Sequence, residues 1–191
     1  MGLKKAIATA YLAVSKWTLV TDELPDKAVL IGAPHTSNWD GVFMAVALWR
    51  SGRDFQFLVK DSLVKAPVLG AFIRSIGGIA VERTQAHGMV STIAQRMREA
   101  DSFILCMTPK GTRSPRGYWK SGFYRIAMEA DAPVHFGFVD ASTRTFGWNG
   151  SIRLSGDMKA DMEVIRGFYS DKVGIRAEKA SVPRLRGEDG D

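Results

Sequence analysis

Short apolar runs alternate with amphipathic segments along most of this chain, and that alternation constrains the fold more than any other feature of the sequence. Five runs have the length of buried strands, at residues 28–33, 55–60, 79–83, 103–108 and 133–139. Segments with helical character lie between them, at residues 38–49, 62–76, 87–100 and 120–130. This order predicts an α/β fold: a single layered domain with a mostly parallel β-sheet flanked by helices.

The rest of the chain completes one domain. No break in composition divides the 191 residues, so a single domain is expected. Residues 145–154 predict a further strand or hairpin, and residues 159–169 predict a last helix. The ending RGEDGD after Pro183 indicates a flexible tail. We therefore expect an N-terminal helix over residues 1–18, the domain over 19–180 and a tail over 181–191.

The first 18 residues predict an amphipathic helix. Apolar residues recur there at helical spacing, at Ile7, Ala10, Tyr11, Val14 and Trp17. Lys16 interrupts the apolar part, so a signal peptide is not indicated, and no stretch approaches the length of a membrane span. Such a helix either lies in a membrane interface or packs on its own domain, and the sequence supports both interpretations equally.

The charge balance favours anionic partners. Lysine and arginine number 26 against 20 acidic residues, which gives a net charge of +6 and suits nucleic acid, an anionic bilayer or phosphorylated substrates. Basic and aromatic residues do not interleave on any one element, so nucleic acid is not expected. Cys106 is the only cysteine, which excludes an intrachain disulfide. The three histidines lack metal-ligand spacing, so neither a metal nor a cofactor is expected.

Polar motifs follow three of the predicted strands. They are APHTSNWD at residues 33–40, ERTQ at 82–85 and TPKGTRS at 108–114. In open α/β sheets, ligands bind outside the carboxyl ends of the strands. We therefore expect the three motifs to gather at one edge of the sheet and to form a site there.

The first motif contains a histidine and an aspartate five residues apart, His35 and Asp40. A carboxylate bonded to Nδ1–H of an imidazole fixes its tautomer and leaves Nε2 as a base. The pair corresponds to the His–Asp half of a catalytic triad. The nucleophile would then be a hydroxyl of the substrate instead of a protein serine. Alternatively, the histidine is bonded within a loop and the aspartate favours a helix N-terminus.

The other two motifs carry cations. Arg83 ends a strand at the proposed ligand edge, where its guanidinium suits a phosphate or a surface salt bridge with Glu82. The third motif places Lys110 and Arg113 around a glycine after a strand. It lacks the spacing of a Walker loop, so it is either a different anion-binding loop or a solvated basic turn.

Together these motifs resemble those of the glycerolipid acyltransferases, the lysophosphatidic acid acyltransferase superfamily. HTSNWD is similar to the family's H-x4-D motif, GGIAVER at residues 77–83 to its second block, and TPKGTRS to its third. APVHFG at residues 132–137 is similar to the fourth block. All four occur in the family's order, and WKSGF at residues 119–123 resembles a short bacterial branch.

The resemblance implies transfer of an acyl group from acyl-CoA or acyl-carrier protein to a hydroxyl of a glycerolipid-type acceptor, which is often phosphorylated. In the resemblance, His35 is the general base and Asp40 its partner. The acceptor site comprises Arg83 and Arg113 for phosphate, Gly111 and Thr112 in the loop, and Lys60 and Lys110 nearby. The implied location is cytoplasmic, at the inner face of a membrane.

Lys110 departs from the family pattern, because the third block normally has a glutamate at this position. An ammonium there reverses a charge within the implied acceptor site. The His35–Asp40 chemistry does not depend on it, so acyl transfer remains the favoured function. The alternative is a non-catalytic, lipid-binding protein with the same fold and a degenerate site.

Overall fold

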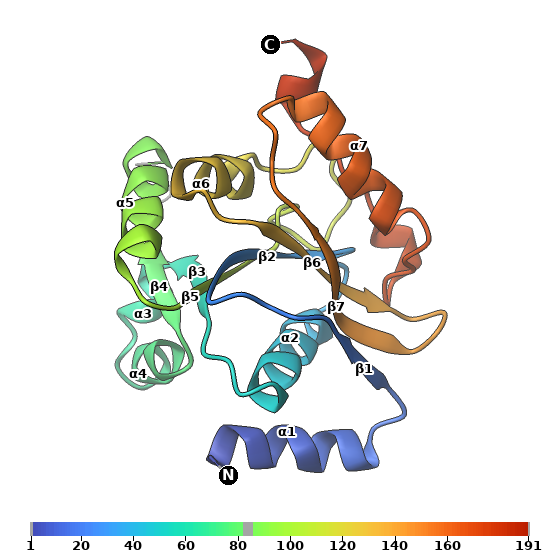
Figure 1. Ribbon diagram of the computed structural model, residues 1–191. Helices are drawn as coiled ribbons and strands as arrows, with labels where there is room; N and C mark the ends of the chain where they lie inside the picture. The colour runs from blue at the N-terminus through green and yellow to red at the C-terminus, as the bar shows by residue number, and fades with distance from the viewer. Residues whose placement is uncertain (1, 82–85, 191) are drawn as a thin grey trace.

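The computed structural model describes residues 2–81 and 86–190, and it confirms the α/β prediction (Figure 1). One sheet of seven strands has the order β1-β7-β6-β2-β5-β3-β4. The strands are β1 Thr18–Thr21, β2 Lys27–Ala33, β3 Gln56–Lys60, β4 Gly78–Val81, β5 Phe103–Met107, β6 Val134–Asp140 and β7 Thr145–Ile152.

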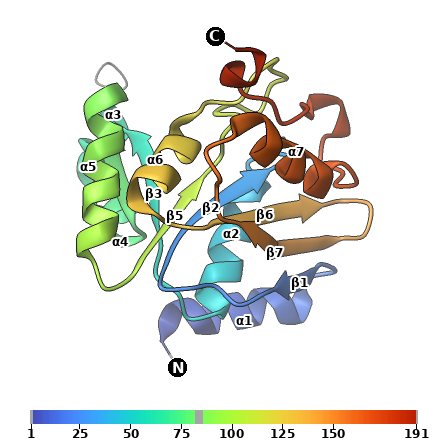
Figure 2. The same ribbon diagram turned by 45° about the horizontal axis from the view of Figure 1, so that its top comes forward.

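Helices cover both faces of the sheet, as Figure 2 shows with α1 on one side and α7 on the other. The longer helices are α1 Leu3–Val14, α2 Trp39–Arg50, α4 Pro67–Ser75, α5 Ala86–Glu99, α6 Gly122–Ala130 and α7 Met158–Tyr169. Three short turns of helix complete the chain: α3 Asp61–Val64, η1 Ala177–Lys179 and η2 Arg186–Asp189.

Strand direction places the site. β2 pairs in parallel with both β5 and β6, and β3 pairs in parallel with β4 and β5. β7 runs antiparallel to β6, and β1 follows the direction of β7. The carboxyl ends of β2, β3, β4, β5 and β6 therefore meet at one edge, which is where the polar motifs were expected to gather.

Each face of the sheet has its own apolar core. On one face, Phe43 and Leu48 of α2 pack on Leu30 and Cys106 of the sheet. On the other, side chains from α5, α6 and α7 pack on the opposite faces of the same strands, among them Ile93, Phe123 and Ile165. The alternation of side chains along each strand supplies both cores at once, as expected for a sheet that is buried on both faces.

Two local features differ from the sequence-based expectation. β1 was not predicted, because four residues of half-exposed strand leave little periodicity to detect. The predicted helix over residues 62–76 is divided into α3 and α4. Pro67 opens α4, and Ala66 before it is extended, because a residue that precedes proline disfavours the helical conformation.

Helix α1 packs on the domain with one face and exposes apolar residues on the other. Ala8 is fully buried, and the Tyr11 ring lies edge-on to Phe43 of α2 at 6.3 Å. Leu3 and Val14 are 77% and 85% exposed. None of the described helices has the length and apolar content needed to cross a bilayer.

The end of the chain lies against the domain, in contrast to the flexible tail expected over residues 181–191. Leu185 is 1% exposed and belongs to the core on the α7 side of the sheet. Pro183 is buried as well. RGEDGD suggested a tail because it is polar. The partners of its charged residues are far away in the sequence, so no local pattern indicated that the segment would be ordered.

Candidate active site

His35 and Asp40 are brought together at the carboxyl end of β2. His35 Nδ1 lies 3.1 Å from Asp40 Oδ2, and their side chains are only 14% and 9% exposed. His35 follows β2 in a loop, and Asp40 sits in the first turn of α2. Five residues of separation suffice because the helix begins at Trp39 and turns the carboxylate back towards the loop.

Asp40 organises the loop as well as the histidine. Its Oδ2 accepts hydrogen bonds from the backbone N–H groups of Thr36, at 2.8 Å, and Ser37, at 2.9 Å. The contact with His35 has the distance of an ion pair but not the angles of a hydrogen bond, since Nδ1 and Asp40 Oδ1 are buried without hydrogen-bond partners among the described residues. Catalytic pairs are often misaligned without substrate and become aligned when it binds.

A cavity of about 680 Å³ begins at this pair. His35, Asp40 and Gly41 line it, together with Thr108 and Gly111 of the third motif. Much of the remaining wall is apolar and comes from both faces of the sheet, including Phe43, Met44, Leu58, Met89, Val90 and Met107. A cavity of this size and lining suits a flexible apolar ligand with a reactive group beside the histidine.

The third motif reaches the cavity through Thr108 and Gly111 and not through Lys110. Gly111 has a φ of +66°, which favours glycine, and a Cβ there would meet the Lys120 side chain at 3.1 Å. Lys110 is 2% exposed and lies outside the cavity wall; its Nζ donates a hydrogen bond of 2.6 Å to the backbone carbonyl of Lys179.

Burial lowers the pKa of Lys110 from its ordinary value, and the nearby carboxylate of Asp40 partly offsets that effect. The ammonium is thus close enough to the His35–Asp40 pair to interact with its carboxylate. Lys110 sits behind the loop that carries the site, and not in the space where the sequence suggested an acceptor would bind.

Thr112 and Arg113, which were also expected in the acceptor site, do not line the cavity. Thr112 Oγ1 accepts a hydrogen bond from Ser114 N at 3.3 Å, within its own loop. Arg113 is exposed and does not line the cavity. Arg83 lies outside the described residues, and of Lys60 only the backbone, the last residue of β3, is described.

Three cations line the cavity that the sequence did not indicate as site residues: Lys120, Arg125 and Arg186. Lys120 belongs to the run WKSGF, which resembles a short bacterial branch of the family, and its side chain lies beside Gly111. No local pattern identifies Arg186, which lies in a segment that was expected to be a tail. Within residues 2–81 and 86–190, no group of three His, Cys, Asp or Glu side chains is placed to hold a metal ion.

Comparison with known proteins assigns the family. The family model described as Acyltransferase matches residues 18–135, which is more than half of the chain and includes His35, Asp40 and the third motif. This chain belongs to the Acyltransferase family. The resemblance of the four sequence motifs is thereby confirmed at the level of the family.

Individual relatives agree with that assignment. The chain is 28% identical over 116 residues to a 1-acyl-sn-glycerol-3-phosphate acyltransferase of Streptococcus pneumoniae (strain ATCC BAA-255 / R6). That alignment covers 60% of this chain but 43% of the relative, so the family member described here corresponds to less than half of that protein's length.

A solved structure shares the fold. The 1-acyl-sn-glycerophosphate (LPA) acyltransferase PlsC from Thermotoga maritima superposes with a TM-score of 0.56. The superposition covers 87% of this chain and 77% of that one, at 18% sequence identity.

Proposed function

We propose that this protein is an O-acyltransferase that moves a fatty acyl group from acyl-CoA or acyl-carrier protein to a hydroxyl of a glycerolipid-type acceptor. The observation that carries the proposal is the position of the His35–Asp40 pair at the wall of a largely apolar cavity, within the span that matches the family model. The two acyltransferases that resemble this chain, by sequence and by fold, support the glycerolipid acceptor.

The reaction follows from the two ring nitrogens of His35. Because Nδ1 faces Asp40, Nε2 is the nitrogen left to take the proton of the acceptor hydroxyl. The acceptor oxygen then attacks the thioester carbonyl and forms a tetrahedral oxyanion. Its collapse breaks the carbon–sulfur bond, and the imidazolium returns the proton to the departing thiolate. The products are the ester and the free thiol, and Asp40 stabilises the imidazolium between the two proton transfers.

The apolar part of the cavity has a separate task, which is to hold the acyl chain. Met89, Val90 and Met107 line it on one face of the sheet, and Phe43 and Met44 line it on the other. Methionine side chains are flexible and adapt to chains of different length. Burial of each methylene contributes about 0.8 kcal/mol, so a long chain is retained far better than a short one.

A panel of donors and acceptors tests the proposal. Purified protein is incubated with labelled acyl-CoA or acyl-carrier protein and with glycerol 3-phosphate, lysophosphatidic acid and neutral lysolipids, and ester formation is measured. We expect transfer to at least one glycerolipid acceptor and loss of that transfer in His35→Ala. Lipid binding without transfer from either donor would contradict the proposal and support the non-catalytic alternative.

A further inference from the structure

The segment after α7, residues 171–190, folds back over the loop that carries His35. Arg176 N donates a hydrogen bond of 3.2 Å to Thr36 Oγ1. Gly174 approaches the same loop so closely that a Cβ would lie 2.7 Å from Thr36 Oγ1 and 3.1 Å from Pro34 Cγ. The C-terminal segment is therefore packed directly on the residues that follow β2.

Further hydrogen bonds join the C-terminal segment to the third motif and to the loop after it. Lys110 Nζ binds the carbonyl of Lys179 at 2.6 Å. Arg116 N donates to Ser181 Oγ at 2.8 Å, and Trp119 N donates to the carbonyl of Arg184 at 2.7 Å. These bonds join backbone or buried groups over more than sixty residues of sequence, so the segment has a defined position.

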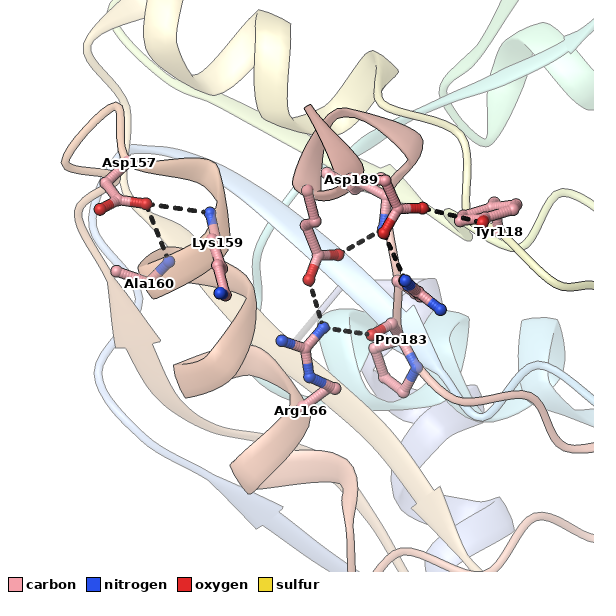
Figure 3. A network of polar contacts seen from close by, with 10 residues as sticks. Tyr118, Asp157, Lys159, Ala160, Arg166, Pro183 and Asp189 are labelled. Atoms are coloured by element: carbon pink, nitrogen blue, oxygen red, sulfur yellow. Dashed lines mark hydrogen bonds and ion pairs between the residues drawn. The ribbon is translucent and has the colours of Figure 1, made fainter. Parts of the chain in front are cut away.

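The last turn of the chain is held by charged side chains, as Figure 3 shows. Arg166 of α7 donates to the carbonyl of Pro183 at 3.1 Å and to Glu188 Oε2 at 2.6 Å. Asp189 Oδ2 accepts a bond of 2.8 Å from the Tyr118 hydroxyl. The network fixes η2, and with it Arg186, at the cavity.

The charges at the cavity wall are unequal. Among the described residues that line the cavity, Lys120, Arg125 and Arg186 are cationic, whereas Asp40 is the one carboxylate. Arg186 lies 5.5 Å from the centre of the Tyr118 ring, and no carboxylate of the described residues pairs with it. Trp119 also lines the cavity, and its buried indole Nε1 has no hydrogen-bond partner among the described residues.

Arg125 and Arg186, beside a single carboxylate among the described lining residues, favour an anion. A phosphate ester offers several acceptor oxygens, and arginine side chains bind such groups bidentately. The same cavity is largely apolar elsewhere, which suits a molecule that has both a phosphate and an alkyl chain. A phosphorylated acceptor such as lysophosphatidic acid has both groups, and so does the donor acyl-CoA.

We propose that Arg125 and Arg186 form the subsite that binds a substrate phosphate ester, and that Lys110 is a positioning residue which holds the C-terminal segment, and so Arg186, at that subsite. This inference rests on the proposed acyltransferase function. It assigns the phosphate to residues other than Arg113 and Lys110, which lie away from the cavity.

Substitution of Arg186 tests the subsite directly. Arg186 is exposed, so Arg186→Gln keeps the fold and removes one charge. We expect its KM for lysophosphatidic acid to rise roughly 10- to 100-fold, because a hydrogen-bonded charge is lost. Transfer to monoacylglycerol, which lacks the phosphate, should be unchanged. Lys179→Gln is the matched control, because it removes a cation from the same segment but keeps the carbonyl that Lys110 binds.

Two donors distinguish the source of the phosphate. If Arg186→Gln instead raises the KM for acyl-CoA, but not for the acyl thioester of N-acetylcysteamine, the subsite binds the donor's phosphates. Both results support a phosphate-ester subsite. Equal behaviour of Arg186→Gln, Arg125→Gln and Lys179→Gln with all four substrates would overturn it.

A double-mutant cycle tests Lys110. If Lys110 acts through Arg186, Lys110→Met should also raise the KM for the phosphorylated substrate with little change in kcat. In the double variant with Arg186→Gln, the KM should then rise by less than the product of the two single fold-changes. A general loss of stability would instead lower transfer to phosphorylated and neutral acceptors alike. Either that result, or a double variant whose KM change equals the product of the single changes, would overturn the role given to Lys110.

Thermal shifts separate this inference from the proposed function. Lysophosphatidic acid should raise the Tm of the wild type more than monoacylglycerol does, and Arg186→Gln should lose the difference. A phosphate-dependent shift in a protein that transfers no acyl group would leave the subsite standing and reject the enzyme. Acyl transfer in which neither the Tm shift nor the KM depends on the phosphate would support the enzyme and reject the subsite.

Discussion

Asp40 Oδ2 lies 3.1 Å from His35 Nδ1 while it also accepts two backbone N–H groups of the intervening loop. One carboxylate thus fixes the loop and orients the imidazole of His35. Loss of its charge affects both the local structure and the chemistry, whereas loss of the imidazole affects the chemistry alone. The two substitutions are therefore expected to differ in their effects on stability.

His35→Ala should lower kcat by about 10²–10⁴-fold, because it removes the general base. The change in stability should be small, since neither ring nitrogen of His35 takes part in a hydrogen bond with another described residue. Steady-state acyl transfer and a thermal melt of the same preparation measure both quantities. A variant with wild-type turnover would exclude the mechanism.

Asp40→Asn should lower both activity and stability. Its amide oxygen still accepts from Thr36 and Ser37 but without charge, so we expect the free energy of unfolding to fall by about 1–3 kcal/mol. Asp140→Asn is the matched control. Asp140 accepts from Ser142 and Thr143 in the turn after β6 and does not line the cavity.

The control variant should be destabilised but active once folded, whereas Asp40→Asn should be impaired even at a temperature where it is fully folded. Denaturant melts and turnover at that temperature provide the comparison. Similar turnover in the two variants would mean that Asp40 is needed only for the loop.

Asp161 makes stability depend on acidic pH. It is 3% exposed and accepts bonds from the Tyr124 hydroxyl at 2.7 Å and from Ser155 Oγ at 2.8 Å. Burial raises the pKa of Asp161, but the bonds from Tyr124 and Ser155 outweigh it and hold the pKa below its ordinary value of 3.8. The contribution is complete above that value and is lost as the pH falls below it towards the folded-state pKa.

Asp161→Asn should accordingly flatten the fall in unfolding free energy as the pH drops below the ordinary pKa of 3.8, because the titrating group is gone. Near neutral pH the variant should be less stable by about 1.5–3 kcal/mol, the typical contribution of hydrogen bonds to a charged group. Urea melts at several pH values measure both effects. A variant whose curve runs parallel to that of the wild type would contradict this role of Asp161.

The sequence allowed prediction of the sheet and of the His35–Asp40 pair because both depend on local patterns. Strand and helix periodicity extends over five to fifteen residues, and five residues across a helix start bring Asp40 to His35. Parallel order then placed the third motif beside the first, as the pairing of Ile31 with Met107 confirms.

The rest of the cavity depends on contacts between distant residues, which no local pattern reveals. Lys110 and Lys179 are 69 residues apart, and only the folded chain shows that the lysine is buried. Lysine is almost never fully buried unless it is paired, so a position facing the ligand was the natural expectation from sequence. Arg186 was missed for a related reason, since its segment is ordered by partners such as Arg166 and Tyr118.

The sequence left open whether the N-terminal helix lies in a membrane interface or packs on its own domain, and helix α1 has features of both. The rings of Tyr11 in α1 and of Trp17 just after the helix pack on Phe43, with ring centres at 6.3 and 4.5 Å, so one side of α1 belongs to the domain. Its outward stripe is nevertheless apolar, with Leu3, Ile7 and Val14 exposed at helical spacing. Deletion of the helix would uncover the core, so substitutions on its outward face are the sharper test.

Ile7→Glu combined with Val14→Glu should weaken binding to vesicles that contain anionic lipid, because it removes apolar contact area and adds repulsion at the headgroups. The matched control is Val164→Glu with Val182→Glu. Val164 and Val182 are exposed and belong to α7 and the C-terminal segment, away from α1. Flotation of the wild type and both pairs with vesicles that contain anionic lipid measures the bound fraction. A weaker Ile7/Val14 variant beside an unchanged control assigns the membrane contact to α1. Equal binding of all three proteins would show that the outward face of α1 makes no such contact.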